Sequence, residues 1–420
     1  MRRRRGQRGF ALIAVVMAVS LVLLTLLVAS TLAQLGSRLI ALQLSNQGQA
    51  LNVANSGLIE GLDYFRRQAA QPVATFNPQH NLAASPPIDD TDDSVTTPVS
   101  IRRDFLLSTP GRLWGHYELV PGTTGNATTG TGVIDLSTNR LGTAAAAGGI
   151  WQLESTGVVY VKNGSVAYNV SPNQVLAKRT VRSEISRLQF TPPAAAISIY
   201  TGSNVSITTK ARVVGGTSAG VFATTGSPSS PASPSVLSGT PGSSTGNAAS
   251  NLSLSNVFGG TITKLSDLVQ VADVSAVTEA AVPNPVQMQI VYLNKSAAVF
   301  NNTTPLKGSG VLVVNGSLTV SGSSNWNGII YVLGNYSQSD PAQVSGAVVV
   351  AGAIPPSSTA TASISSGGTD FTDVYYDPAI LSQIRKQLGQ YRFSRAGYIP
   401  CPATDPLCQK RLSGNREVGY

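Results

Sequence analysis

The sequence contains few residues that suit acid–base chemistry. Charged residues make up only 12% of its 420 residues, and there are two histidines, His80 and His116, far apart in the chain. Positioned histidines and carboxylates are the usual general acids and bases, so little equipment of this kind is present. The HExxH and P-loop GK[ST] patterns do not occur either. We therefore expect a non-enzymatic protein that needs no cofactor and no catalytic residue.

Cysteine is almost as scarce, with only Cys401 and Cys408, which lie in the Pro-containing stretch CPATDPLC. Such a pair suits a disulfide in an oxidising compartment. The alternative is a metal site, which needs more ligands than this region supplies, because neither histidine is near in sequence. We therefore predict a disulfide and no metal site.

Charge is missing from one long stretch near the N-terminus. Five arginines crowd positions 1–9, and from Phe10 to Gly36 the sequence carries no charge. A secretory signal has an apolar core of about 7–15 residues, so this run is too long. About 20 apolar residues span a bilayer as a helix, and flanking arginines favour the cytoplasmic side. The run predicts a single pass through the inner membrane with a cytoplasmic N-terminus.

The basic start, the Gly9–Phe10 pair and the apolar run resemble the class III signal of type IV pilin-like proteins. The resemblance implies cleavage after Gly9 by a prepilin peptidase and N-methylation of Phe10. The glutamate usual at the fifth mature position is Ala14 here, as in minor subunits of the PilX and GspK kind. The resemblance covers about residues 1–68. The alternative is a plain membrane anchor carrying a periplasmic domain.

A helical pattern continues beyond the apolar run. Leu51, Ala54, Leu58, Leu62 and Phe65 recur at three- and four-residue spacing, which predicts one apolar stripe. We expect a single spine helix over 10–70. A helix of that length measures about 90 Å at 1.5 Å per residue.

Residues 71–100 predict a linker. Its aspartates at positions 89, 90, 92 and 93 suggest either a calcium site or a solvated acidic turn, and the turn is preferred because the EF-hand spacing is missing. Alternating stretches within 101–193, such as WGHYELV and IWQLESTGVVYV, predict antiparallel strands. We interpret 101–193 as a pilin-like sheet.

A repeat follows in the C-terminal half. GVLVVNG, GIIYVLG and GAVVVAG begin at Gly310, Gly328 and Gly346, in equal steps of 18 residues. A fixed period of β-branched runs favours a β-solenoid over an antiparallel meander. In that solenoid Val311, Val313 and Leu318 would stack on Ile329, Tyr331 and Tyr336. We place the insertion at 194–356 and expect earlier coils at 197–216 and 259–265. The sequence of this repeat is similar to that of the solenoid in ComZ-type competence pilins.

Two further segments have distinct compositions. The low-complexity stretch 223–252 has too few apolar residues to offset its ordering entropy, so it predicts a flexible loop. In 357–420, the sequence DPAILSQIRKQLGQY predicts a helix with Asp377 as its N-cap, followed by the disulfide loop.

Clusters of basic residues suggest nucleic-acid contact, because lysines and arginines neutralise phosphates and nearby aromatics stack on bases. Solvated surface charge is the preferred alternative. The seven candidates for such contact are Lys178, Arg179, Arg182, Arg385, Lys386, Arg392 and Arg395.

Together these features predict an α+β fold with a long N-terminal spine helix, an antiparallel pilin-like sheet and an inserted β-solenoid. The resemblance implies a minor type IV pilus subunit, priming or tip-located, that presents the solenoid for adhesion or for DNA binding. Its expected partners are other pilins, pilus assembly proteins, the prepilin peptidase, the inner membrane, and DNA or a surface ligand. Its expected location is the inner membrane, then the periplasm or an extracellular pilus. Alternatives are a type II secretion pseudopilin, a periplasmic scaffold and a membrane-anchored carbohydrate-active protein.

Overall fold

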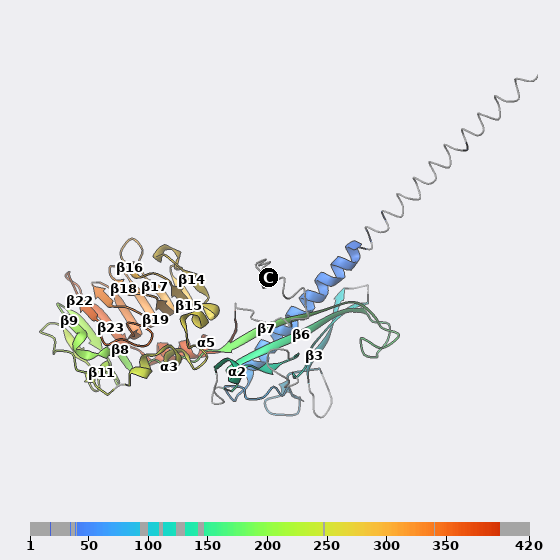
Figure 1. Ribbon diagram of the computed structural model, residues 1–420, viewed down its shortest axis with the longest axis horizontal. Coiled ribbons are helices and arrows are strands. Elements are labelled where there is room, and N and C mark those ends of the chain that lie inside the picture. Colours follow the sequence, from blue (N-terminus) through green and yellow to red (C-terminus); the bar gives the residue numbers. More distant parts are fainter. Residues whose placement is uncertain are drawn as a thin grey trace, which may run out of the picture. The chain divides into compact units, whose positions relative to one another are not determined.

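The computed structural model describes residues 40–92, 100–108, 112–122, 131–141, 147–246, 248–339 and 341–394, together with positions 17, 34 and 38 (Figure 1). The chain divides into two compact units. Unit 1 comprises Met1–Glu60, Pro78–Val120 and Glu154–Val181, as far as these are described. Unit 2 comprises Gly61–Asn77, Pro121–Leu153 and Arg182–Tyr420, with the same restriction.

The helical part of the N-terminal region covers residues 40–67. Of its predicted apolar stripe, Ala54, Leu58, Leu62 and Phe65 are buried, whereas Leu51 is 41% exposed. The predicted stripe is therefore confirmed at four of five positions. Burial of one face is what stabilises an amphipathic helix in a protein.

A six-stranded sheet follows, with the order β24-β7-β6-β4-β3 and β5 paired to β6. The pairs β3–β4, β4–β6, β5–β6 and β7–β24 are antiparallel. The predicted strands near 114–120, 150–161 and 175–187 are thereby confirmed. The strands are β3 (Ile101–Ser108), β4 (Leu113–Leu119), β5 (Ile134–Asp135), β6 (Ile150–Val161), β7 (Gln174–Arg187) and β24 (Tyr391–Phe393).

Within unit 1 the helix lies directly against β6. A Cβ added to Gly157 would lie 2.3 Å from the backbone nitrogen of Ala54 and 2.4 Å from the carbonyl oxygen of Ala50. A Cβ on Gly57 would lie 2.2 Å from Ser155 Oγ. Both glycines thus permit a close approach of helix and strand that a side chain would prevent.

The predicted fold class is wrong. The described chain is mostly β, its sheets are mostly parallel, and no helix spans the predicted 10–70. The further α-helices contain ten residues or fewer, and we find no spine-length helix among the described residues. These short helices are α2 (Ser137–Leu141), α3 (Leu254–Phe258), α4 (Leu265–Val271) and α5 (Pro378–Gln387).

The predicted membrane pass is also contradicted. Among the described residues, no helix is both long enough and apolar enough to cross a membrane. The predicted localisation depended on such a span and loses its basis. Most of the apolar run from Phe10 to Gly36, on which the prediction was based, lies outside the described residues.

The largest part of unit 2 is a stack of coils over 195–376, in which the chain alternates between two parallel sheets. We call it the coil stack. One sheet has eleven strands and contains β15, β17, β19 and β21; the other has five, in the order β16-β18-β20-β22-β9. The strands of the last four coils are β15 (Val286–Leu293), β16 (Ala297–Phe300), β17 (Lys307–Val314), β18 (Ser317–Val320), β19 (Asn325–Val332), β20 (Tyr336–Ser339), β21 (Gln343–Val350) and β22 (Ala362–Ser365).

The register of these coils follows the 18-residue step. Gly310 pairs with Gly328, and Gly328 with Gly346. Val311 lies opposite Ile329, Val313 opposite Tyr331, and Leu318 opposite Tyr336. The predicted stacking of these three pairs is confirmed.

The first coil of the stack lies beyond its last one. Strands β8 (Ala195–Thr201) and β9 (Val205–Thr208) pair with β21 and β22, through Ile197↔Val348 and Val205↔Ala362. The chain then reaches the opposite end of the stack and coils back. The other strands of the eleven-stranded sheet are β10 (Ala211–Val214), β11 (Ala219–Thr225), β12 (Val236–Ser238), β13 (Ser243–Ser244), β14 (Val274–Ala276) and β23 (Thr372–Tyr376).

The apolar side chains between the two sheets form the main core. Leu312, Val314 and Ile330 come from the eleven-stranded sheet, and Leu318 and Val320 from the five-stranded one. All five are fully buried. The opposite face of β15, β17, β19 and β21 is also buried, because α3, α4 and α5 cover it.

Three sequence predictions for this region can be compared with the structure. The stretch 223–252 is not simply a flexible loop, because β12 and β13 add to the sheet beside β10 and β11, and η3 (Ala249–Leu252) buries Leu252. Backbone pairing along a sheet supplies the stabilisation that the side chains lack. Residues 259–265 form a turn into α4 and not a coil. The predicted C-terminal helix is confirmed as α5, with Asp377 Oδ1 accepting from the N–H groups of Ala379 and Ile380.

Candidate functional site

The outer face of the five-stranded sheet carries hydroxyl-bearing side chains on four of its five strands; β16 presents Ala297 and Val299 there. Strands β18, β20, β22 and β9 have the sequences SLTV, YSQS, ASIS and VSIT. Their apolar or large residues point into the core, so the alternate residues point outward. One of them, Ser317, accepts from the backbone N–H of Asn335 at 3.1 Å. We call the other outward hydroxyl side chains the hydroxyl face; they are Thr319, Ser337, Ser339, Ser363, Ser365, Ser206 and Thr208.

The strand register arranges the hydroxyl face in two columns. Thr319 pairs with Ser337, Ser337 with Ser363, and Ser363 with Ser206. In the second column Ser339 pairs with Ser365, and Ser365 with Thr208. Val299 of β16 continues the first column at the end of the sheet.

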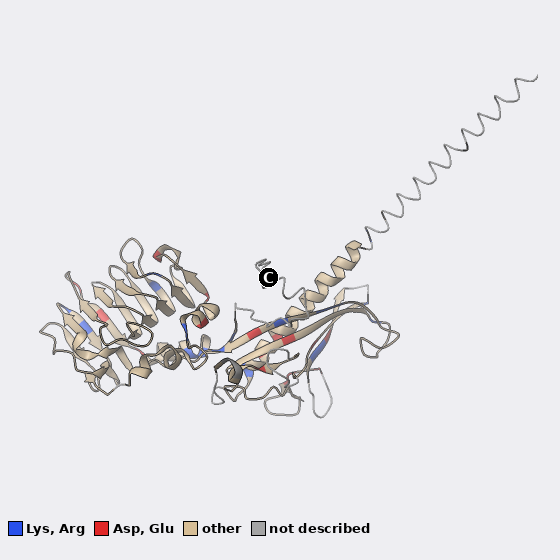
Figure 2. Cartoon of the chain, in the orientation of Figure 1, with Lys and Arg blue, Asp and Glu red and all other residues tan. Residues whose placement is uncertain are grey.

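The hydroxyl face is uncharged and its hydroxyls are available. None of the five strands of this sheet contains Lys, Arg, Asp or Glu, and Figure 2 shows few charged segments on the coil stack. Within the described chain, none of the seven side chains has a hydrogen-bond partner. A hydroxyl offers one donor and two acceptors, so the face presents unused hydrogen-bonding capacity to its surroundings.

A buried polar group fixes the central strand of this face. Gln338 is 1% exposed, and its Nε2, which carries two N–H groups, lies within hydrogen-bond distance of three acceptors: the carbonyl oxygens of Ala342 and Asp373 at 2.9 Å and Thr372 Oγ1 at 3.1 Å. Its Oε1 accepts from the Tyr336 hydroxyl at 2.5 Å. A fully bonded amide between the two sheets holds β20 in one position relative to β23.

An ion pair lies at β16, an edge strand of the same sheet. Glu279 of η4 (Glu279–Ala281) bonds Lys295 Nζ at 2.6 and 2.7 Å, and its Oε1 also accepts from the backbone N–H of Val299 at 2.6 Å. Burial alone would raise the pKa of Glu279, but these hydrogen bonds and the Lys295 charge hold it below its ordinary value. An edge N–H bonded in this way is not available to pair with another strand. A hollow of about 220 Å³ lies beside it, lined by Glu279, Pro283, Phe300 and Thr304 among others.

The basic residues proposed for nucleic-acid contact are distributed over both units. Lys178 and Arg179 are exposed in unit 1, where Arg179 Nη2 donates to Gln47 Oε1 at 2.5 Å. In unit 2, Arg182 is half-buried on β7, and Arg385 and Lys386 are exposed on α5. Arg385 Nε donates to the carbonyl oxygen of Phe190 at 2.8 Å, so this side chain holds α5 to the segment that enters the coil stack.

Arg392 has a structural partner. Its Nη2 bonds Asp273 Oδ1, and its side chain is only 19% exposed. Nearby Arg66 donates from Nε to the carbonyl oxygen of Tyr391, and burial together with the Arg392 charge lowers the pKa of Arg66. Arg392 is therefore engaged inside unit 2. Arg395 lies outside the described residues.

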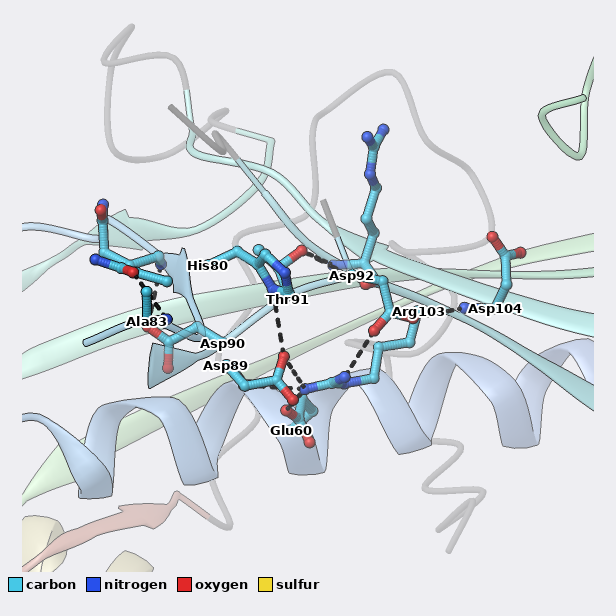
Figure 3. Close-up of polar contacts among 12 residues, drawn as sticks. Glu60, His80, Ala83, Asp89, Asp90, Thr91, Asp92, Arg103 and Asp104 are labelled. Carbon is cyan, nitrogen blue, oxygen red and sulfur yellow. Dashed lines mark hydrogen bonds and ion pairs between the residues drawn. The ribbon is translucent and has the colours of Figure 1, made fainter. Parts of the chain in front are cut away.

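Part of the acidic cluster of the linker gathers around an arginine. Arg103 Nη1 lies 2.7 Å from Asp92 Oδ1, and its Nη2 lies 3.4 Å from Glu60 Oε1 and 3.7 Å from Asp89 Oδ1 (Figure 3). Desolvation works against the charge of Arg103, yet the three carboxylates raise its pKa. The guanidinium thus occupies the position that a cation would take among these carboxylates, which argues against the calcium alternative. Position 93 lies outside the described residues.

A histidine–aspartate pair is the feature of unit 1 closest to a catalytic arrangement. His116 is 4% exposed, and its Nδ1 lies 3.1 Å from Asp104 Oδ1, which also accepts from the Tyr160 hydroxyl at 3.0 Å. Desolvation would raise the pKa of Asp104, but these hydrogen bonds lower it below its ordinary value. His116 Nε2 is buried without a partner among the described residues, and the ring stacks on Tyr168 at 4.2 Å. In the described part of the chain no hydroxyl or thiol lies at hydrogen-bond distance from Nε2, so the pair has no nucleophile to activate there.

Two stretches fit the G-x-S-x-G pattern of hydrolase nucleophiles, at 216–220 and 242–246. That chemistry requires a strand, a sharp turn with the serine at its apex, and then a helix. Ser218 precedes strand β11, and Ser244 lies within the short strand β13. Neither serine occupies a nucleophile elbow.

The remaining sequence-predicted residues, Gly9, Phe10, Cys401 and Cys408, lie outside the described residues. Because both cysteines lie there, the described part of the chain contains no disulfide, and the predicted pairing stays a prediction.

Sequence reasoning missed the hydroxyl face. The signal was present in the short alternating pieces between the three apolar repeats, such as SLTV and YSQS. Their significance depends on the register between coils, because Ser337 and Ser363 are 26 residues apart and become neighbours only through the pairing of β20 with β22.

Comparisons of the chain with protein-family models, with curated proteins and with solved structures gave no match.

Proposed function

We propose that this protein is a minor subunit of a type IV pilin-like filament, and that it acts by presenting the coil stack and not by catalysis. The observation that carries the proposal is the order of its parts. A basic leader with Gly9–Phe10 precedes an uncharged run, a helix packed on an antiparallel sheet follows, and the coil stack is inserted before the last strand of that sheet.

The way in which the coil stack is inserted into the chain supports its display by the antiparallel sheet. The chain leaves the sheet after β7, builds the coil stack, and returns through α5 to β24, which pairs with β7 through Tyr391↔Arg187. The two ends of the insertion are thus adjacent strands of one sheet. An insertion with adjacent ends leaves the host sheet intact, and it is free to carry a binding surface of its own.

Adhesion is the better supported role for the coil stack. The basic residues are divided between the two units, and Arg179, Arg385 and Arg392 each bond to the protein itself. The hydroxyl face, in contrast, is a regular surface with unused hydrogen-bonding groups. Nucleic-acid affinity depends mainly on lysines and arginines that neutralise phosphates, and the hydroxyl face has none.

The proposal is tested at the N-terminus of the mature protein. In cells that contain a prepilin peptidase, we expect a mature chain that begins with N-methyl-Phe10, detected by mass spectrometry. Gly9→Asp should leave the leader attached, whereas Gly6→Asp, a matched change within the leader, should not prevent cleavage. A mature protein that retains Met1, or cleavage that ignores the change at Gly9, contradicts the proposal.

Filament incorporation gives an independent measurement. The protein should co-purify with sheared fibres at a level well below that of the major subunit, and the Gly9→Asp variant should be missing from that fraction. Equal recovery of both variants in the fibre fraction would contradict assembly through a processed N-terminus.

A further inference from the structure

The hydroxyl face has a regular geometry set by the backbone. Neighbouring strands lie about 4.8 Å apart, and alternate residues of one strand lie about 6.6 Å apart. The two columns therefore present hydroxyls on a grid with these spacings, across four strands in one column and three in the other. The side chains are short, so holding them in one conformation costs little entropy.

The chemistry of this grid excludes several classes of ligand. The absence of Lys and Arg from its strands argues against phosphate polymers and other polyanions. No aromatic side chain is among the outward residues, so bases have nothing to stack on. Protein interfaces depend on buried anchors such as Trp, Tyr and Arg, and the seven residues of the face include none of these.

We propose that the hydroxyl face binds an uncharged polysaccharide, with the extended glycan chain lying along the two columns and across the strands. Serine, threonine and sugar hydroxyls each donate one hydrogen bond and accept others, so they can bond to one another. Because each of the four strands presents hydroxyls at the same register positions, successive strands can bond to successive sugars of one chain. Repetition is the source of affinity, because each contact is weak and successive contacts along one polymer act at high effective concentration.

The position of the face supports an external occupant of this kind. The outer face of β15, β17, β19 and β21 in the other sheet is covered by α3, α4 and α5, with Tyr331 and Val313 completely buried. No described segment covers the hydroxyl face in the same way, since Ser206 and Thr208 are exposed and the other five residues are partly exposed. This inference names the ligand of the coil stack and rests on the proposed function for its setting.

The test uses the purified full-length protein and three insoluble neutral glycans: microcrystalline cellulose, chitin and a β-1,3-glucan. We expect retention on at least one of them that changes little between low and high salt. The double variant Ser337→Lys/Ser363→Lys places two charges at the centre of the face and should reduce retention at least tenfold. The variant Ser337→Ala/Ser363→Ala keeps the surface neutral and should reduce retention about threefold.

The matched control is Ser275→Lys, because Ser275 is an exposed serine of β14 in the other sheet. Retention of this variant should equal that of the wild type, and circular dichroism should show all three variants folded. No retention on any of the three glycans, equal retention of the double lysine variant, or retention that falls steeply with salt would overturn the inference. Because glycan retention is measured on purified protein and N-terminal processing in cells, failure of this inference is distinguishable from failure of the proposed function.

Discussion

The two sheets of the coil stack share one core, but their outer faces differ: helices cover that of the larger sheet over β15, β17, β19 and β21, and that of the smaller sheet is partly exposed. The apolar runs VLVV and IIYV of β17 and β19 are buried on both sides, with Val313 and Tyr331 facing the covering helices. The strands β18 and β20 alternate between core and surface. Continuous apolar runs are typical of parallel strands covered on both faces, and alternation of strands with one open face. A stack of coils can therefore bury the outer face of one sheet under helices and leave the outer face of the other sheet exposed.

We call the helix-covered side of β15, β17, β19 and β21 the covered flank, and the side that carries the hydroxyl face the open flank. The largest expected effect on stability concerns the covered flank. Tyr331 is completely buried, packs edge-on against Phe258 at 5.2 Å, and donates its hydroxyl to the carbonyl oxygen of Leu252 at 2.7 Å. We expect Tyr331→Ala to lower the free energy of unfolding by about 3–5 kcal/mol, as for other large aromatic truncations. Urea unfolding measures it.

The matched change on the open flank is Ser337→Ala, which should alter the free energy of unfolding by less than about 0.5 kcal/mol because surface substitutions rarely do more. Comparable losses for Tyr331→Ala and Ser337→Ala would break the distinction between the two flanks.

The next effect concerns the spacing between coils, on which both flanks depend. Gly346 has φ of 137°, and a Cβ there would lie 2.1 Å from the carbonyl oxygen of Gly328 in the neighbouring coil. Gly346→Ala should therefore cost about 1–3 kcal/mol in backbone strain, with further loss from the clash. Gly367→Ala is the control, since nothing lies within 4 Å of its added Cβ. A thermally neutral Gly346→Ala variant would contradict the close contact between coils.

A smaller effect is expected from the polar link between the flanks. Gln338→Leu removes the amide that bonds Tyr336, Thr372 and two backbone carbonyls inside the core. The change leaves the Tyr336 hydroxyl and the Asp373 carbonyl oxygen without this partner, and we expect it to lower the free energy of unfolding by about 1–3 kcal/mol. If urea unfolding showed Gln338→Leu to be as stable as the wild type, the amide would not be needed to hold the open flank in register.

The smallest effect is a pH dependence at the edge of the open flank. The pKa of Glu279 is lowered from its ordinary 4.5, so its ion pair stabilises the fold above that pH, and the contribution is lost as pH falls through the lowered value. The size should stay below about 1 kcal/mol because Lys295 is 37% exposed and water screens the pair.

Glu279→Gln should therefore destabilise the protein at pH 7 and converge with the wild type under acid, as followed by thermal unfolding. Asp370→Asn, at an exposed carboxylate without an ion pair among the described residues, is the control and should change the stability at pH 7 by less than about 0.5 kcal/mol, as surface substitutions usually do. A constant difference between Glu279→Gln and the wild type from pH 7 to pH 3 would contradict the linkage.

Local pattern predicted several elements well. The 18-residue step placed Val311 opposite Ile329 and Leu318 opposite Tyr336, because stacked coils of equal length keep a fixed register. Asp377 and Pro378 predicted the start of α5, since a cap depends only on adjacent residues. Composition misled at 223–252, where backbone pairing with β10 and β11 orders a stretch that has few apolar side chains.

The sequence by itself determined the local periods: the helical stripe from Ala54 to Phe65, the alternation in β18 and β20, and the 18-residue step between the glycines that begin the apolar repeats. Only the tertiary structure decided which residues meet across long separations. It placed the first coil beyond the last, joined β24 to β7, and aligned Thr319, Ser337, Ser363 and Ser206 in one column. The physical reason is that a period fixes which side of a strand a residue faces, whereas its neighbours across the sheet are fixed by the path of the chain and the packing of the core.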